Sequence, residues 1–268
     1  MATLAGQGTA LVTGASSGIG EVYAERLADR GYDLVLVARR RPELERLAAT
    51  ISARTGRTVD VLVADLAESA DQVLVERRLR EDATITLLLN NAGIVAEGPA
   101  PGIDSSGIDR MLAVNVVALT RLSAAAAAAF ADRGRGTIVN IASVMAFIPS
   151  VAAGAYAATK AYVLHLSRGL DEGFGKQGVR VQAVLPGYTR TPLIDTPRLA
   201  GLPAEIVMPV EELVDAALAG LDQGETVTIP PLPDTAEWDA YEAARVTVQQ
   251  NVMRNRPGER YRKPAKAA

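Results

Sequence analysis

The sequence has no cysteine and a single histidine among its 268 residues. Without cysteine, the chain has no disulfide and no thiolate to serve as a nucleophile or metal ligand. One histidine cannot supply the clustered nitrogen and sulfur ligands that a transition metal prefers. We therefore expect no metal site and no disulfide framework.

Aromatic residues and net charge are also scarce. Aromatics make up 4% of the chain, whereas hydrophobic residues make up 49%, so the core should consist mainly of Ala, Val, Leu and Ile. The net charge of −3 comes from charges mixed along the sequence, and this pattern does not predict nucleic-acid binding. The first residues lack a secretory pattern, and no uninterrupted apolar run approaches the ~18 residues of a membrane span. We expect a cytoplasmic protein that binds neither nucleic acid nor membrane.

Apolar strand-like runs alternate with amphipathic helical stretches along most of the chain. This alternation predicts an α/β protein with a doubly wound, seven-stranded parallel sheet between two helical layers, which is a Rossmann fold with three α/β/α layers. The strands are expected at residues 9–13, 33–38, 59–64, 86–89, 137–141, 179–185 and 226–229. The helices are expected at 19–30, 42–54, 68–80, 105–131, around Tyr156 to about 173, and 210–221.

No linker or change of composition divides the chain, so we predict one domain over residues 1–268 with its core at 8–229. The proline-rich stretch at about 190–209 is long for a connecting loop, and it is predicted to be a substrate loop or lid. Residues 230–268 are predicted to form a partly helical C-terminal tail whose last residues are disordered.

A glycine-rich segment, TGASSGIG, follows the first predicted strand and opens the first predicted helix. Gly14, Gly18 and Gly20 allow the backbone to approach a phosphate closely, and a helix N-terminus presents free N–H groups to it. The spacing is Gly-x3-Gly-x-Gly, and an ordinary glycine turn is the alternative. The flanking strand and helix favour a dinucleotide-binding turn.

The end of the second predicted strand indicates which dinucleotide is bound. A carboxylate that binds the ribose 2′-hydroxyl is typical there, but this chain has Ala38 and Arg39 instead. A guanidinium can pair with a 2′-phosphate, which a carboxylate would repel. We therefore predict NADP(H) over NAD(H), with Arg39 as the first candidate and Arg40 as the second. Arg41 is expected only to cap the strand and solvate the next helix. The alternative for Arg39 and Arg40 is that they do the same and bind no phosphate.

Other polar or turn-forming residues follow further strands. Asp65 could bond the adenine amino group, cap the next helix, or do both, and Asn90 to Gly93 suit a sharp turn beside a ligand. Pro186 and Gly187 follow the sixth strand. Ligands of open parallel sheets bind at the carboxyl ends of the strands, so these residues should converge at one edge.

The stretch from Ser143 to Lys160 is predicted to carry the chemistry. Tyr156 and Lys160 are four residues apart, which puts them on one face of a helix. A nearby ammonium favours a phenolate, so we expect the pKa of Tyr156 to lie below its usual value of about 10. Ser143 can supply a second hydrogen bond to a substrate oxygen. Read alone, the Tyr–Lys pair could equally be a solvated helix face.

Two more polar residues deserve separate interpretation. Asn115 lies inside a predicted helix, where asparagine is locally unfavourable, so we expect a reason such as a bound water, a kink or solvent exposure. His165 follows Tyr156 by nine residues, which points it to the opposite helix face. We predict a structural role for His165.

In this order and spacing, the motifs resemble those of the short-chain dehydrogenase/reductase family in its simple, non-extended form. The resemblance spans about residues 8–229 and rests on TGASSGIG at 13–20, Asp65, NNAG at 90–93, Asn115, Ser143, YAATK at 156–160 and PGYTRT at 186–191. It implies a hydride transfer between the nicotinamide of NADP(H) and a carbonyl or alcohol carbon.

The resemblance also implies residue roles. Tyr156 would be the general acid in reduction and the base in oxidation, Ser143 would hold the carbonyl oxygen, Lys160 would bind the nicotinamide ribose and lower the tyrosine pKa, and Asn115 would hold a water in the proton relay. Asn90 would line the cofactor cleft. The implied cofactor-binding residues are Gly14, Ser16, Ser17, Gly18, Ile19, Gly20, Arg39, Arg40, Asp65, Leu66, Asn91, Ala92, Gly93, Tyr156, Lys160, Pro186, Gly187, Thr189 and Thr191.

The predicted function is an NADPH-dependent carbonyl reductase, reversible as an alcohol dehydrogenase, that acts on a small, neutral and apolar ketone or aldehyde. The alternatives are a non-catalytic NADP(H)-binding redox sensor and an epimerase or dehydratase. The polar C-terminal tail argues against fatty-acid elongation, and Tyr-x3-Lys argues against an enoyl reductase.

A homotetramer or homodimer is expected, with Ala124–Ala129 suited to the interface. Candidate pocket residues, which could instead be core, are Ile94, Val95, Val144, Met145, Phe147, Tyr188 and Leu193.

Overall fold

The computed structural model describes residues 7–95, 105–149, 154–192 and 201–261. The middle of the predicted lid, residues 193–200 with Leu193, and the end of the tail, residues 262–268, therefore lie outside the described residues. The chain divides into two compact units, residues 1–231 and 232–268. The second unit corresponds closely to the tail predicted from residue 230, and the two are described separately.

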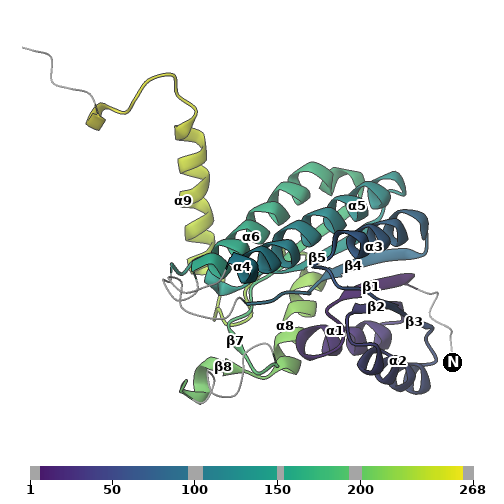
Figure 1. The fold of residues 1–268 in the computed structure, drawn as a ribbon. Coiled ribbons are helices and arrows are strands. Elements are labelled where there is room, and N and C mark those ends of the chain that lie inside the picture. Colours follow the sequence, from purple (N-terminus) through teal and green to yellow (C-terminus); the bar gives the residue numbers. More distant parts are fainter. Residues whose placement is uncertain (1–6, 96–104, 150–153, 193–200, 262–268) are drawn as a thin grey trace, which may run out of the picture. The chain divides into compact units, whose positions relative to one another are not determined.

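The first unit contains a seven-stranded sheet in which every neighbouring pair is parallel, in the order β3-β2-β1-β4-β5-β6-β9 (Figure 1). The predicted doubly wound parallel sheet is therefore confirmed. All five residues of β1 are buried, and β2 contains the buried apolar run Leu34–Val37, as expected for strands covered on both faces. The strands are β1 (Thr9–Thr13), β2 (Asp33–Ala38), β3 (Val59–Val63), β4 (Ile85–Asn90), β5 (Gly136–Ile141), β6 (Val179–Val184) and β9 (Val227–Thr228).

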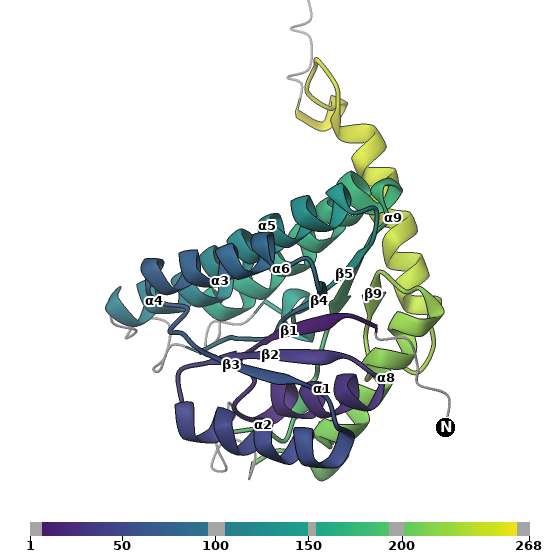
Figure 2. The same cartoon turned by 90° about the vertical axis from the view of Figure 1, so that its right-hand side faces the viewer.

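Helices cover both faces of the sheet, which gives the predicted three layers (Figure 2). One apolar core lies between the sheet and α1, α2 and α8; the other lies between the sheet and α3, α5 and α6. The helices are α1 (Gly18–Asp29), α2 (Arg41–Thr55), α3 (Ser69–Glu81), α4 (Ser105–Leu112), α5 (Leu119–Asp132), α6 (Gly154–Phe174) and α8 (Val210–Gln223).

The strand order reverses direction between β1 and β4. At such a switch point the connections leave toward opposite faces, so a crevice opens at the carboxyl ends of the two strands. Gly14 follows β1, and Asn91 follows β4. The topology thus places the glycine-rich turn and the Asn-Ala-Gly turn side by side.

The helix predicted at 105–131 is divided by a π-helical turn, Ala113–Ala118, between α4 and α5. By length and hydropathy the whole segment Ser105–Asp132 could cross a membrane, but 56% of its most apolar window is buried inside the protein. A core helix passes the same test. Ala125, Ala126 and Ala127 pack in the chain's own core, whereas Ala124 and Ala128 are exposed. That Ala124–Ala129 suits a subunit interface stays a prediction.

The region predicted as an irregular lid contains a second, two-stranded parallel sheet. Its strands are β7 (Tyr188–Thr189) and β8 (Val207–Met208), and Arg190 N–H donates to the Met208 carbonyl at 3.2 Å. A 3-10 turn, Ala204–Ile206, precedes β8. Both ends of the 190–209 segment are thereby held to each other.

The second unit contains α9 (Ala236–Val252) and a short 3-10 turn, Glu259–Tyr261. Within α9, Trp238 and Tyr241 stack with their ring centroids 5.5 Å apart. The helical character predicted around these two residues is confirmed. Residues 262–268, the end expected to be disordered, lie outside the described residues.

Candidate active site

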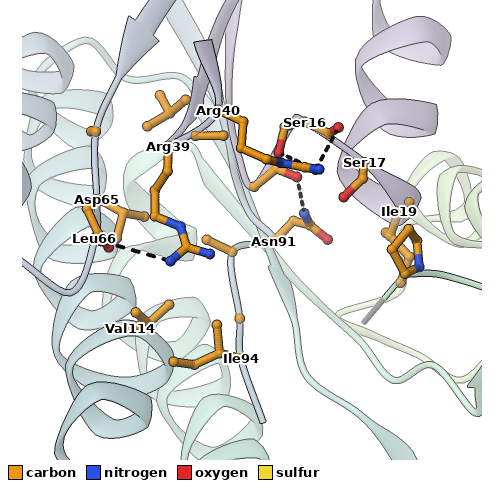
Figure 3. Close-up of a pocket in the computed structure, with 18 of the residues that line it drawn as sticks. Ser16, Ser17, Ile19, Arg39, Arg40, Asp65, Leu66, Asn91, Ile94 and Val114 are labelled. Carbon is orange, nitrogen blue, oxygen red and sulfur yellow. Dashed lines mark hydrogen bonds and ion pairs between the residues drawn. The ribbon is translucent and has the colours of Figure 1, made fainter. Parts of the chain in front are cut away.

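A cavity of about 420 Å³ opens at the carboxyl ends of the central strands (Figure 3). It brings together residues that follow β1, β2, β3 and β4, as the topology requires. The sequence-predicted residues that line it are Gly14, Ser16, Ser17, Gly18, Ile19, Arg39, Arg40, Asp65, Leu66, Asn91, Ala92, Gly93 and Thr191.

The glycine turn forms one wall of this cavity. Gly14 and Gly18 have φ angles of +66° and +59°, which favour glycine. Gly20 does not line the cavity but packs beneath it, because a Cβ there would overlap the Gly14 carbonyl oxygen and the Asn91 amide. The first N–H groups of α1 have no partner within the helix and face the cavity wall. This arrangement fits a pyrophosphate.

Asn91 holds the two turns together. Its Nδ2 donates to the carbonyl oxygens of Thr13 at 3.0 Å and Gly14 at 3.2 Å. Thr13 Oγ1 in turn accepts from the backbone N–H groups of Asn91 and Ala92. The switch point between β1 and β4 is therefore fixed by hydrogen bonds in both directions.

Arg39 and Arg40 both line the cavity and are exposed, but they are held differently. Arg40 Nη2 donates to the Ser16 carbonyl oxygen at 3.1 Å and to Ser16 Oγ at 3.0 Å. Arg39 Nη1 lies 4.0 Å from Asp65 Oδ2, beyond hydrogen-bond distance. Arg41 pairs with Glu45 along α2 and does not line the cavity, as predicted.

Asp65 uses both carboxylate oxygens within the protein. Oδ1 accepts from Ala67 N–H at 3.0 Å, and Oδ2 accepts from Arg110 Nη2 at 2.6 Å. The predicted helix-capping role is wrong, because α3 begins at Ser69 with Glu68 at its cap; Asp65 closes the preceding turn instead. Burial acts to raise the pKa of Asp65, but the bonds from Ala67 and Arg110 and the nearby guanidinium charges hold the pKa below its usual range.

Lys160 lies behind Gly93, one of the residues that line the cavity. Its side chain is buried, and Nζ donates to the Ile141 carbonyl oxygen at 2.9 Å. A Cβ built on Gly93 would lie 3.6 Å from Nζ, so the ammonium is next to the cavity wall. Burial lowers the pKa of Lys160 to about 8, because a buried ammonium loses its hydration.

Tyr156 lies one turn before Lys160 on α6, and the Lys160 Nζ is 5.5 Å from the centroid of the Tyr156 ring. Burial raises the pKa of Tyr156 to about 12, and a hydrogen bond with Ser143 lowers it by a smaller amount. The expected pKa below 10 is therefore wrong for this structure, because the loss of phenolate hydration outweighs the hydrogen bond with Ser143.

Ser143 is buried and sits at the start of a 3-10 turn, Val144–Ala146. Its Oγ accepts from Met145 N–H at 3.2 Å and donates to the Pro186 carbonyl oxygen at 3.3 Å. These bonds fix the hydroxyl beside Tyr156. Ser143, Tyr156 and Lys160 therefore form one cluster, although neither Tyr156 nor Lys160 is among the residues that line the cavity.

Asn115 occupies the π-helical turn and is buried. Its Oδ1 accepts from Ile94 N–H and its Nδ2 donates to the Ile94 carbonyl oxygen, both at 2.9 Å. Nδ2 also lies 3.3 Å from Thr159 Oγ1. Of the reasons expected for Asn115, the structure gives a helix distortion, and it excludes solvent exposure.

Asn90 does not line the cavity, so the role implied for it is wrong. It is buried, and its Nδ2 donates to Ser123 Oγ and Asn140 Oδ1, both at 2.9 Å. Asn140 Nδ2 donates to Ser167 Oγ at 3.0 Å. This network joins β4, β5, α5 and α6 inside the core. His165 is exposed on α6, consistent with its predicted place away from Tyr156.

The segment after β6 connects the two ends of the site. Pro186 accepts the Ser143 bond, and Thr189 Oγ1 donates to the Gly187 carbonyl oxygen at 3.1 Å. Pro186, Gly187 and Thr189 do not line the cavity, whereas Thr191 does. A Cβ built on Gly18 would lie 3.2 Å from Thr191 Cβ, so this segment reaches the glycine turn.

None of the six described candidate substrate residues belongs to either apolar core, so for these six the alternative that they are core is wrong. Ile94, Val95, Val144 and Met145 are half-buried, and Phe147 and Tyr188 are exposed to 36% and 44%. Ile148 and Ile206 add exposed apolar surface, at 50% and 48%. Leu193 lies outside the described residues.

Further residues line the cavity that the sequence analysis did not propose as cofactor contacts. They are Val37, Ala38, Ala64, Arg110, Val114 and Pro192. Arg110 and Val114 are four apart on the helix that carries Asn115. This spacing could have predicted both residues, because residues four apart lie on the same face of a helix.

Comparisons with known proteins agree with this geometry. The short chain dehydrogenase profile matches residues 8–199. A very-long-chain 3-oxoacyl-CoA reductase of Anas platyrhynchos is 34% identical over 187 residues, which are 68% of this chain and 60% of that protein. The chain thus spans about 60% of the length of the first curated relatives it matches.

Two solved structures are similar over almost the whole chain. A short-chain dehydrogenase from Sphingobium yanoikuyae in complex with NADPH is 48% identical, with a TM-score of 0.91 over 95% of this chain and 100% of that one. The bulky-bulky ketone specific alcohol dehydrogenase from Comamonas testosteroni is 47% identical, with a TM-score of 0.88 over 95% and 98%. The Rossmann sheet, the glycine turn and the Ser–Tyr–Lys cluster agree with these similarities. The chain belongs to the short-chain dehydrogenase family.

Proposed function

We propose that the protein is an NADPH-dependent carbonyl reductase, reversible as an alcohol dehydrogenase. The observation that carries this proposal is that two arginines and a Ser–Tyr–Lys cluster lie at the same cavity. Arg39 and Arg40 line the cavity after β2, and Lys160 lies behind Gly93, which lines the cavity after β4. Ser143 and Tyr156 stand beside that lysine.

The residues present fit NADPH. The glycine turn and the start of α1 would hold the pyrophosphate, the two arginines would hold the 2′-phosphate, and Lys160 would bind the nicotinamide ribose. The Sphingobium structure is in complex with NADPH. When bound, NADPH supplies a hydride to the carbonyl carbon.

The chain's own residues handle the proton. Ser143 Oγ donates a hydrogen bond to the carbonyl oxygen, and Tyr156 transfers its phenolic proton to the same oxygen as a new C–H bond forms at carbon. The products would be the alcohol, the oxidised cofactor and a Tyr156 phenolate, which Lys160 would stabilise when it is charged. Because burial raises the pKa of Tyr156 to about 12, the phenol is protonated at neutral pH, as reduction requires.

The substrate is proposed to be a neutral ketone or aldehyde with apolar substituents. Phe147, Tyr188 and Ile206 supply exposed apolar surface, and pockets for small molecules are lined mainly by such side chains. The Comamonas neighbour is named for bulky-bulky ketones. We therefore favour ketones with a sizeable apolar group on each side.

Assembly as a homodimer or homotetramer and a cytoplasmic location remain part of the proposal. Leu112, Val117 and Tyr162 are exposed to 40%, 45% and 39% on the long helices, and they would supply an apolar contact surface. Light scattering of the purified protein tests the assembly. Cell fractionation of the native host tests the location.

The test of the function is NADPH consumption with a panel of apolar ketones and aldehydes, followed at the nicotinamide absorbance band. Turnover with NADPH, poor use of NADH and loss of turnover in Tyr156→Phe are expected. NADH used as well as NADPH would contradict the cofactor assignment. Tight NADPH binding without turnover of any carbonyl would favour the non-catalytic redox sensor.

A further inference from the structure

Arg110 and Arg39 reach the same carboxylate oxygen from two different elements. Arg110, in the last turn of α4, donates from Nη2 to Asp65 Oδ2 at 2.6 Å. Arg39, directly after β2, has its Nη1 at 4.0 Å from that oxygen. Asp65 is therefore engaged by Arg110 and only approached by Arg39.

The rest of Asp65 is also occupied. Its Oδ1 accepts from Ala67 N–H at 3.0 Å, and its own N–H donates to Asp71 Oδ2 at 2.7 Å. Arg40, the other guanidinium of this wall, is held by Ser16 and lies 3.4 Å from Glu43. Among the described residues of this wall, Arg39 is the guanidinium whose ion pair lies beyond hydrogen-bond distance.

We propose that Arg110 is a positioning residue for cofactor selectivity, which holds the Asp65 carboxylate so that Arg39 is left for the 2′-phosphate of NADPH. This inference rests on the proposed function. Arg110 and Asp65 both line the same cavity as Arg39. If Arg110 were removed, Asp65 would keep its charge, take Arg39 as its partner and repel a phosphate placed beside it.

An exposed ion pair with no such task is the plain alternative, and the chain offers one for comparison. Arg41 and Glu45 pair at 3.3 Å on α2, with side-chain exposures of 62% and 58%, and neither lines the cavity. Arg110 differs because its partner is shared with a cavity residue. Substitution of Arg110 is therefore expected to change phosphate binding, whereas substitution of Arg41 is not.

The experiment measures binding of 2′,5′-ADP and 5′-AMP by calorimetry, so it needs neither a carbonyl substrate nor turnover. The proteins are the wild type, Arg110→Leu, Arg110→Leu with Asp65→Asn, and Arg41→Leu as the control. Asparagine keeps an oxygen for Ala67 N–H but removes the charge. Far-UV circular dichroism and a thermal melt establish that each variant is folded.

Arg110→Leu is expected to bind 2′,5′-ADP about fivefold more weakly, the effect of one partly screened charge, and to bind 5′-AMP as the wild type does. Adding Asp65→Asn is expected to restore 2′,5′-ADP binding, because the competing carboxylate is then neutral. Arg41→Leu is expected to change neither affinity.

Unchanged 2′,5′-ADP binding in Arg110→Leu would overturn the proposal. A loss that Asp65→Asn does not restore would also overturn it, since Arg110 would then contact the phosphate itself. A wild type without preference for 2′,5′-ADP over 5′-AMP would contradict both this inference and the NADPH assignment. A clear preference in a protein that reduces no carbonyl would contradict the reductase function alone.

Discussion

Lys160 donates from Nζ to the carbonyl oxygen of Ile141 at 2.9 Å, and this bond ties the middle of α6 to the last residue of β5. Ser143 lies two residues beyond Ile141, so one strand end positions both groups that flank Tyr156. The lysine is buried and cannot rotate freely without losing the bond. The ammonium position is therefore set by the sheet and not by the helix alone.

Replacing Tyr156 by Phe is expected to lower the rate of carbonyl reduction by about 10²–10⁴-fold, the usual contribution of a general acid. The phenyl ring keeps the packing, so NADPH binding should stay within about twofold. Stopped-flow reduction and a fluorescence titration of NADPH measure the two quantities. Equal rates for the variant and the wild type would assign the proton transfer to another group.

The pH profile of reduction is expected to fall above pH about 8. Burial lowers the pKa of Lys160 to about 8, so the ammonium loses its proton as the pH rises through that value. Its charge then no longer stabilises the Tyr156 phenolate formed by proton transfer. Steady-state kcat/KM against pH measures this limb, which should be missing in Lys160→Met. A flat wild-type profile to pH 10 would contradict the role of the lysine charge.

Replacing Arg39 by Leu is expected to weaken NADPH binding by about tenfold and NADH binding little, because a charge-assisted bond to the 2′-phosphate is lost. Arg41→Leu serves as the control, since Arg41 belongs to the same arginine run but pairs with Glu45 outside the cavity. The ratio of KM values for the two cofactors measures the effect. An equal loss for NADPH and NADH would assign Arg39 to general packing.

Replacing Asn115 by Ala is expected to lower the free energy of unfolding by about 1–3 kcal/mol, because the half-buried N–H and carbonyl of Ile94 both lose their partner. Reduction should slow as well, since Ile94 lines the cavity. Urea unfolding measures the stability. Asn251→Ala, at an exposed position of α9, should stay within about 0.5 kcal/mol of the wild type. Equal stabilities for the two variants would contradict the clamp.

Two helical glycines are expected to respond oppositely to alanine. In Gly20→Ala the new Cβ meets the Gly14 carbonyl oxygen and Asn91, so unfolding should become easier by about 1–3 kcal/mol. In Gly169→Ala nothing lies within 4 Å of the Cβ, so helix propensity should stabilise the protein by about 0.5–1 kcal/mol. Paired thermal melts measure both. Similar shifts in the two variants would show that the glycine turn tolerates a side chain.

The sequence determined the fold and the membership of the site because both depend on local patterns. Buried strands of a parallel sheet are continuous apolar runs, so β1 and β2 could be recognised directly. The alternation of strands and helices then implied one binding edge, where Gly14, Arg39 and Asp65 were expected and are found. Short motifs were sufficient to predict the members of the site, because each motif directly follows a strand and the strand ends share one edge of the sheet.

The tertiary structure alone decided what depends on burial and on contacts between distant elements. The pKa of Tyr156 is raised and not lowered, because desolvation depends on how tightly α6 packs against Ser143 and its neighbours. Asn90, the last residue of β4, bonds to Asn140 inside the core, while Asn91, the first residue after the strand, bonds to the glycine turn. Arg110 reached Asp65 across 45 residues of sequence, a contact that carries no local pattern and arises only when α4 is set against the end of β3.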